Sequence, residues 1–157
     1  MRIAFVWIGK TRDRHIAALA DDYLERARRM ARVEVIELRD RGGASSERGE
    51  PAVRDREAEA LLGALADDDF VILCDERGSQ LRSEEFARII SHHQERATRR
   101  VAFVIGGYLG VAPRIRERAD AVIALSKMTF THEMARLLLS EQLYRALTIV
   151  NGIPYQK

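Results

Sequence analysis

Five short apolar segments alternate along the chain with segments of helical spacing, and this alternation constrains the fold more than any other feature. The predicted strands are residues 2–8, 33–38, 70–74, 101–105 and 121–125. The predicted helices are residues 12–31, 51–65, a helix capped by Ser83, 113–118 and 131–150. Such alternation predicts an α/β fold with a parallel sheet that carries helices on both faces. Because there is no repeat or linker, we expect residues 1–157 to form a single domain.

The last predicted helix is apolar on nearly all of its faces. Met134, Leu137 and Leu138 form one apolar face, and Leu139 and Leu143 belong to a second. A helix that is apolar all round is buried on both sides. In so small a chain we expect a second subunit to cover one of these sides, so the pattern predicts a homodimer.

The composition excludes several classes of protein. Hydrophobic residues make up 46% and charged residues 32% of the chain, which is typical of a folded globular domain. No apolar run approaches the ~20 residues of a membrane helix, and residues 1–9 lack the cleavage site of a signal peptide. We therefore expect a cytoplasmic protein with no membrane partner. A single cysteine, Cys74, excludes an internal disulfide and a multi-thiolate zinc site.

No metal site is predicted from the histidines. His92 and His93 are adjacent, so on a helix they point in different directions and make a poor metal pair. We expect both to be ordinary surface residues.

Charge is distributed unevenly along the chain. Residues 1–32 carry a net charge of +4 (8 basic, 4 acidic), residues 33–100 a charge of −5 (11 and 16), and residues 101–157 a charge of +3 (7 and 4). Arginine supplies 23 of the 26 positive charges, and its planar guanidinium suits phosphate. If the two basic ends meet in space, they form a surface that favours polyanions.

The stretch FVIGGYLG, residues 103–110, places glycines at the end of a predicted strand, where parallel sheets bind ligands. Its spacing differs from the G-x-G-x-x-G of dinucleotide-binding proteins, and the chain contains no P-loop sequence. The glycines alone fit either a tight turn, the commoner use of glycine, or a close approach to a ligand.

The glycine stretch together with the C-terminal segment resembles one family. Residues 101–157, and above all the stretches LSKMTF (125–130) and EQLYRA (141–146), are similar to the RlmH family of ribosomal RNA methyltransferases, in the SPOUT superfamily of knotted methyltransferases. The similarity extends more loosely to VILCDERG (71–78) and IGK (8–10), so it covers essentially the whole chain.

The resemblance implies a C-terminal trefoil knot, a homodimer and S-adenosyl-L-methionine as cofactor. Carried over by position, the cofactor-binding residues would be Cys74, Gly106, Leu125, Ser126, Lys127, Met128, Thr129 and Phe130. Most of these contacts would use backbone groups around a flat adenosyl group, and a Cβ on Gly106 would fill that space.

The resemblance also implies the reaction, which is methylation of N3 of a pseudouridine in helix 69 of 23S rRNA on the assembled ribosome. We expect Arg145, oriented by Glu141, to stabilise the developing imide anion. Glu141 and Arg145 also fit an ordinary helix ion pair. Tyr155 could stack on a base, and Lys157 could meet phosphate.

The sequence departs from the family at Gln156, where relatives usually have histidine. Glutamine can hydrogen-bond the ring but cannot accept a proton near neutral pH. The acceptor is then water, or His132, which also fits a helix cap. Tyr108 and Leu109 also stand where relatives tend to have polar residues or proline, which affects the substrate-facing wall.

RNA contacts are expected from Arg12, Arg14, Arg114 and Lys157, and from arginines of the predicted loop 39–50, namely Arg39, Arg41 and Arg48. Each of these fits a solvated surface charge equally well. Two rival functions stay open: a catalytically weakened or inactive RNA-binding dimer that still binds cofactor, and a nucleotide-binding α/β protein without an RNA partner.

Overall fold

The structure, a computed structural model, describes residues 1–40 and 49–155. Over these residues the chain forms a five-stranded sheet in the order β2-β1-β4-β3-β5, and every neighbouring pair is parallel. The strands are β1 (Arg2–Ile8), β2 (Arg32–Leu38), β3 (Phe70–Gln80), β4 (Arg100–Ile105) and β5 (Ala121–Ala124). The predicted α/β class with a parallel sheet is confirmed.

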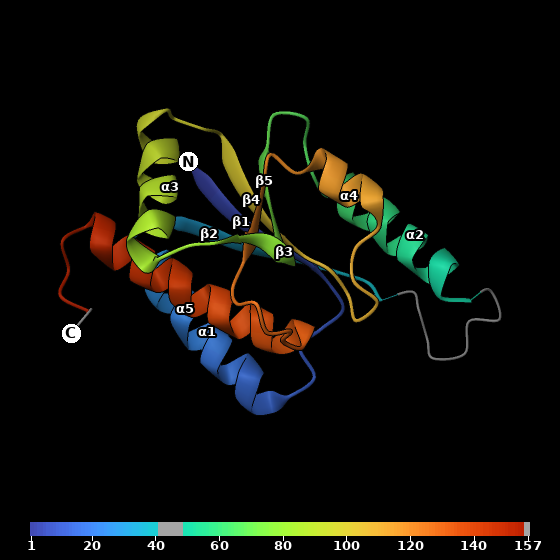
Figure 1. Cartoon of the computed structure of the whole chain (residues 1–157). Helices are drawn as coiled ribbons and strands as arrows, with labels where there is room; N and C mark the ends of the chain where they lie inside the picture. Colours follow the sequence, from blue (N-terminus) through green and yellow to red (C-terminus); the bar gives the residue numbers. More distant parts are fainter. Residues whose placement is uncertain (41–48, 156–157) are drawn as a thin grey trace.

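Helices cover both faces of the sheet, as Figure 1 shows. They are α1 (Arg14–Arg28), α2 (Gly49–Gly63), α3 (Ser83–Glu95), α4 (Pro113–Arg118) and α5 (His132–Val150). One core cluster joins the sheet to α1, α3 and α5, and a second joins it to α2 and α4. The molecule therefore has three layers, and its sheet is buried from both sides.

The central strand β1 shows why these sequences form a buried sheet. Ile3, Phe5 and Trp7 enter the first cluster, whereas Ala4 and Val6 enter the second. Successive side chains of a strand point to opposite faces, so a continuous apolar run fills both cores.

Strand β3 is longer than predicted. Its pairing with β4 ends at Cys74, but the strand continues to Gln80 beside β5 after a register shift between Cys74 and Ser79. A Cβ on Gly78 would lie 2.6 Å from the carbonyl carbon of Ile123, so a glycine lets the two backbones approach. The apolar pattern stops at Cys74 because the extension is largely exposed, and the prediction stopped there too.

The predicted helix cap at Ser83 is wrong. Arg82 occupies the N-cap of α3, and its backbone N–H donates to the carboxylate of Glu85 at 2.7 Å. Ser83 is the first residue of the helix, and its hydroxyl donates to Oε1 of Gln142 on α5 at 2.9 Å. The Ser83 side chain therefore bonds to α5 and does not cap α3.

The prediction for His93 is also wrong, because its side chain is buried. Its ring lies 4.0 Å from that of Phe70, and its Nδ1 lies 3.0 Å from Oγ1 of Thr98. His92 is exposed, as predicted.

Helix α5 lies between α1 and α3 on one face of the sheet (Figure 1). Each of its residues is buried or half-buried within one chain. Neighbouring helices therefore supply much of the cover that the sequence analysis assigned to a second subunit. The homodimer and the trefoil knot both stay predictions.

Candidate active site

The carboxyl edge of the sheet brings the predicted cofactor segments together. Cys74 lies opposite Ile105 of β4 on one side and Ile123 of β5 on the other. Gly106 directly follows Ile105, and Leu125 comes two residues after Ile123. Segments far apart in sequence therefore meet at the edge where parallel sheets bind their ligands.

A cavity of about 320 Å³ opens beside this edge, between β5, α3 and α5. Most of its lining residues are apolar, and they include Phe86, Ile123, Leu125, Phe130, Leu138 and Leu139. Ser83 and Gln142 add polar groups. Such a combination, with an apolar wall and a few polar groups, is typical of small-molecule sites.

The predicted cofactor loop, residues 125–130, begins and ends on this cavity. Its conformation is fixed by Ser126, whose hydroxyl accepts from the backbone N–H of Met128 at 2.9 Å, and by Thr129, whose hydroxyl donates to the carboxylate of Glu76. Met128 is 71% exposed, and Lys127 is exposed too. The ends of the loop thus face the cavity, while its middle extends from the surface.

Cys74 is not suited to nucleophilic chemistry. Burial raises the pKa of its thiol to about 12. Since the thiolate is the nucleophile, the group is inert near neutral pH. Cys74 is therefore suited to form part of the wall of the site, and it is not suited to react with a substrate.

The Gly106–Gly107 pair closes a tight turn. The backbone N–H of Gly110 donates to the carbonyl of Gly107 at 3.1 Å, and a Cβ on Gly106 would lie 2.5 Å from Cγ1 of Val111. The chain itself therefore fills the space where the sequence analysis expected the adenosyl group. The turn explains the need for glycine, and a cofactor contact at Gly106 stays a prediction.

A buried acid that the sequence analysis missed lies behind this turn. Glu57 of α2 is 6% exposed, and a Cβ on Gly107 would lie 2.7 Å from its Oε2. Among the described residues, this oxygen has no hydrogen-bond partner. Burial, and next the charge of Asp40, raise the pKa of Glu57. Its spacing of four from Val53 and Leu61 was the sequence signal for an inward-facing side chain.

Glu141, Arg145 and Tyr155, three of the predicted catalytic residues, lie together. Arg145 donates to Oε1 of Glu141, and the Tyr155 hydroxyl donates to the same oxygen at 3.3 Å. The Arg145 guanidinium lies 4.8 Å from the centre of the Tyr155 ring. The hydrogen bond to Glu141 raises the pKa of Arg145, and burial raises that of Tyr155 to about 12. Both groups keep their protons at neutral pH.

Further aromatic rings extend this cluster onto α1. The rings of Tyr144 and Tyr155 lie 4.7 Å apart, those of Tyr23 and Tyr144 lie 6.1 Å apart, and the Arg26 guanidinium covers both Tyr23 and Tyr144. No pattern in the sequence predicts this contact, because it depends on how α1 packs against α5.

Within one chain, the cluster and the cofactor loop are separated along α5. Glu141 comes nine residues after His132, which is about 14 Å along a helix axis. Gln142 links the two regions, because its side chain accepts from Ser83 in the cavity wall and donates to Oε2 of Glu141 at 2.7 Å. Glu141 is therefore held from both sides.

The first turns of α5 contact the loop after β1. Arg136 is 1% exposed, lies 5.0 Å from the centre of the Trp7 ring and donates to the carbonyl of Ile8 at 2.6 Å. Burial, followed by the charge of Arg136, lowers the pKa of His132. His132 is thus neutral at physiological pH and could accept a proton.

The predicted RNA contacts are dispersed. Arg12 pairs with Asp40 at 3.7 Å, Arg14 donates to His15 at 3.3 Å, and Arg114 donates to a carbonyl of α2. All three arginines are exposed, as is Arg39. The remaining predictions, for Arg41, Arg48, Gln156 and Lys157, lie outside the described residues.

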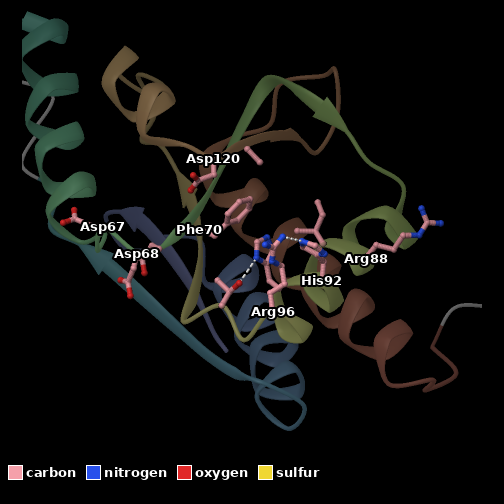
Figure 2. A pocket seen from close by; sticks show the side chains of 12 residues that line it. Asp67, Asp68, Phe70, Arg88, His92, Arg96 and Asp120 are labelled. Carbon is pink, nitrogen blue, oxygen red and sulfur yellow. Dashed lines mark hydrogen bonds between the residues drawn. The ribbon is translucent and has the colours of Figure 1, made fainter.

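A larger hollow lies at the amino ends of β3 and β5 (Figure 2). Figure 2 shows Phe70, His92 and Arg96 gathered in it, with Arg88 pointing away. It lies far from the predicted cofactor segments. Over residues 1–40 and 49–155, no group of three or more acidic, histidine or cysteine side chains could hold a metal, and no helix is long and apolar enough to cross a membrane.

Comparison with known proteins gives a consistent result. A family model described as "Predicted SPOUT methyltransferase" matches residues 1–156. Proteins named "Ribosomal RNA large subunit methyltransferase H" are similar over nearly their full length: that of Geobacter sulfurreducens is 46% identical over 155 residues (99% of each chain), and that of Gemmatimonas aurantiaca 42% over 157 (100% of each).

Solved structures share the fold at low sequence identity. A probable methyltransferase from Bordetella pertussis has a TM-score of 0.55 at 16% identity, over 93% of this chain and 96% of the other. A probable methylase family protein from Haemophilus influenzae has a TM-score of 0.56 at 15% identity, over 99% and 70%. With this fold, and with close relatives over its whole length, the chain belongs to the SPOUT methyltransferase family.

Proposed function

We propose that this enzyme transfers a methyl group from S-adenosyl-L-methionine to N3 of a pseudouridine in helix 69 of 23S rRNA on the assembled ribosome. The observation that carries the proposal is the cavity at the carboxyl edge of the sheet, which is lined by Leu125 and Phe130, the two ends of the predicted cofactor loop. The names of the full-length relatives supply the class of substrate.

The cavity suits an adenosyl group. Its apolar walls, with Phe86 and Phe130 among them, can cover a flat ring, while Ser83 and Gln142 offer hydrogen bonds. When bound, the cofactor supplies a methyl carbon made electrophilic by a sulfonium. The residues of this chain would bind the donor, orient it and exclude water from the reacting atoms.

In this reaction a bond between N3 and the methyl carbon would form as the carbon–sulfur bond breaks, and the N3 proton would leave to water or to His132. Arg145 stabilises the negative charge that develops on the imide, and Glu141 fixes its direction. Gln142 holds the other oxygen of Glu141, so this carboxylate cannot turn freely. Holding the methyl carbon and N3 ~3–3.5 Å apart in line can lower the reaction barrier by ~7–11 kcal/mol.

The site is proposed to need two chains. Glu141 and Arg145 lie some three turns along α5 from the cofactor loop of their own chain, about 14 Å away along the axis. In a homodimer, this cluster and the C-terminal tail with Lys157 would face the partner's cofactor loop. The trefoil threading of the last segment belongs to the same proposal.

The test is methyl transfer to ribosomes from a strain that lacks this gene. We expect the purified protein with labelled cofactor to add one methyl group to a helix 69 pseudouridine, identified by mass spectrometry of the isolated RNA fragment. Assembled ribosomes should accept the methyl group and free 23S rRNA should not. Methylation of another nucleotide, or none, would contradict the proposal.

A second candidate is a weakened or inactive enzyme, which Gln156 favours because glutamine cannot accept the N3 proton. Converting Gln156→His separates the two. A rise in kcat of about 10²-fold or more, the usual contribution of a general base, with unchanged cofactor KM would support this candidate. An active wild type that gains nothing would support water or His132 as acceptor.

A further inference from the structure

A strongly basic hollow lies at the amino end of the sheet, opposite the candidate active site. It has a volume of about 580 Å³. Its lining includes Arg2 at the start of β1, Arg28 and Arg29 at the end of α1, Arg32 at the start of β2, and Arg99 just before β4. Figure 1 marks the N-terminus near this end of the sheet. Four of these arginines belong to the basic segment 1–32, but none of the five was among the predicted RNA contacts.

The positive charge of the hollow is largely uncompensated. No acidic residue in the part of the chain that the structure describes lines it, although Arg99 at its edge donates to both oxygens of Asp68 at 2.9 Å. Over residues 1–40 and 49–155, the other four arginines have no carboxylate within ion-pair distance. The guanidinium of Arg28 donates to the carbonyl of Val33 at 3.2 Å, which fixes its position at the edge of the hollow.

Part of this charge has a structural explanation. Cations near the C-terminus of α1 complement the helix dipole, which accounts for Arg28 and Arg29. The dipole does not account for Arg2, Arg32 and Arg99, which come from three different strand starts. The fold therefore gathers like charges that repel one another, and such an arrangement favours an anionic ligand.

We propose that this hollow binds phosphates of ribosomal RNA, as a second contact surface of the protein; the inference rests on the proposed function for the identity of the RNA. Guanidinium groups bind phosphate in a bidentate manner. A membrane is disfavoured as the partner, because the apolar lining residues, Met1, Met30 and Ala31, are half-buried and offer little surface for insertion.

The position of the hollow determines what it can contact. β1 has seven residues and spans about 23 Å between the two ends of the sheet. RNA held here therefore lies away from the nucleotide at the candidate active site. The hollow would contribute affinity and orientation without sequence readout, as phosphate contacts do.

The experiment uses a double variant, Arg29→Gln with Arg32→Gln, because both side chains are exposed and make no hydrogen bond in the described structure. A charge-preserving variant, Arg29→Lys with Arg32→Lys, tests for charge alone. Arg88→Gln, exposed on α3 and outside the hollow, is the matched control. Thermal unfolding confirms that all variants fold. Binding to ribosomal large subunits is measured between 50 and 200 mM salt, and methyl transfer is measured in parallel.

We expect the glutamine variant to lose affinity, with the slope of log Kobs against log salt reduced by about 0.7–0.9 for each lost phosphate contact. The lysine variant should keep the wild-type slope, and the control should match wild type. Methyl transfer by the glutamine variant should return to the wild-type rate at saturating ribosome concentration.

Unchanged binding and slope in the glutamine variant, while wild type methylates ribosomes, would overturn this inference and leave the proposed function intact. If the wild type transfers no methyl group but its ribosome binding depends on these arginines, the proposed function is contradicted and this inference is supported. Binding to phosphatidylserine vesicles that depends on Arg29 and Arg32, with ribosome binding unchanged, would also overturn it.

Discussion

Glu141 divides its two carboxylate oxygens between different neighbours. One accepts from Arg145 and Tyr155, and the other from Gln142. This differs from a simple helix ion pair, because the carboxylate is fixed by groups from α5 and the C-terminal tail together. At the scale of single residues, the structure therefore supports an oriented guanidinium rather than a solvent-exposed charge.

Replacing Arg145→Lys should lower kcat by about 10²–10³, the usual cost of losing a donor that stabilises transition-state charge. Lysine keeps the charge but loses the planar fork that Glu141 orients. KM for the cofactor should stay nearly unchanged, because Arg145 is not among the residues that line the cavity. Steady-state methyl transfer to ribosomes measures both constants, with Arg88→Lys as control. A variant with wild-type kcat would show that Arg145 has no catalytic role.

Replacing Glu57→Gln should stabilise the protein at neutral pH, because a neutral amide removes the buried negative charge that burial and Asp40 disfavour. Because burial raises the pKa of Glu57, the folded state favours its protonated form. The stabilisation that Glu57 gives the wild type is therefore present at pH values below its ordinary pKa of 4.5, and it is lost as the pH rises. The gain from glutamine should therefore vanish near pH 4.5.

Urea unfolding at pH 7.5 and pH 4.5 measures this difference. Glu59→Gln, on the exposed side of the same helix, is the control and should change little at either pH. A gain of equal size at both pH values would show that the charge of Glu57 is not responsible.

At the scale of elements, the extension of β3 past Cys74 determines the shape of the site. It shifts the register against β5 and ends beside Ser83 at the start of α3. It also carries Glu76, which receives the hydroxyl of Thr129 from the cofactor loop. The loop is therefore supported by a strand segment whose own sequence is largely polar.

Replacing Gly78→Ala should destabilise the protein by at least the 1–3 kcal/mol typical of overpacking, because the new Cβ would meet the β5 backbone at 2.6 Å. Cofactor affinity should fall with it, because the loop after β5 would move. Urea unfolding and calorimetric titration of S-adenosyl-L-methionine measure the two effects. Gly63→Ala, with no atom within 4 Å of its new Cβ, is the control. Equal behaviour of the two variants would refute the close approach.

At the scale of the whole molecule, the two ends of the sheet carry different chemistry. The carboxyl edge holds the apolar cavity and the cofactor loop, and the amino edge holds the arginine-lined hollow. The Glu141–Arg145–Tyr155 cluster begins about 14 Å along α5 from the predicted cofactor loop of its own chain, which is the arrangement expected if each chain completes the site of the other.

Mixed dimers test this arrangement. Arg145→Met should inactivate the Glu141–Arg145–Tyr155 cluster. Leu125→Trp should fill the cavity and so prevent cofactor binding. Each variant alone should be inactive, but a random mixture should recover about a quarter of the wild-type sites, because half of its dimers then carry one intact site of two. Light scattering checks that both variants form dimers. No recovery in mixtures of dimeric variants would place the whole site within one chain.

The sequence by itself determined the local elements and their order. Apolar runs such as that of residues 2–8 can be buried in only a few ways, and alternation with helices then dictates a parallel sheet. The motifs LSKMTF and EQLYRA were equally local, so the family could be predicted from them. Thr131 was predicted as the first residue of the last helix but is its N-cap, and its hydroxyl accepts from the backbone N–H of Met134.

Only the tertiary structure decided which distant residues meet. Ser83 was predicted to cap a helix but bonds Gln142, and His93 was predicted at the surface but packs on Phe70. The arginines of the basic hollow come from three separate segments, at residue 2, residues 28–32 and residue 99, that no periodicity connects. Spacing along a chain reports local geometry, whereas contacts between strand ends and helices depend on how the whole sheet is ordered.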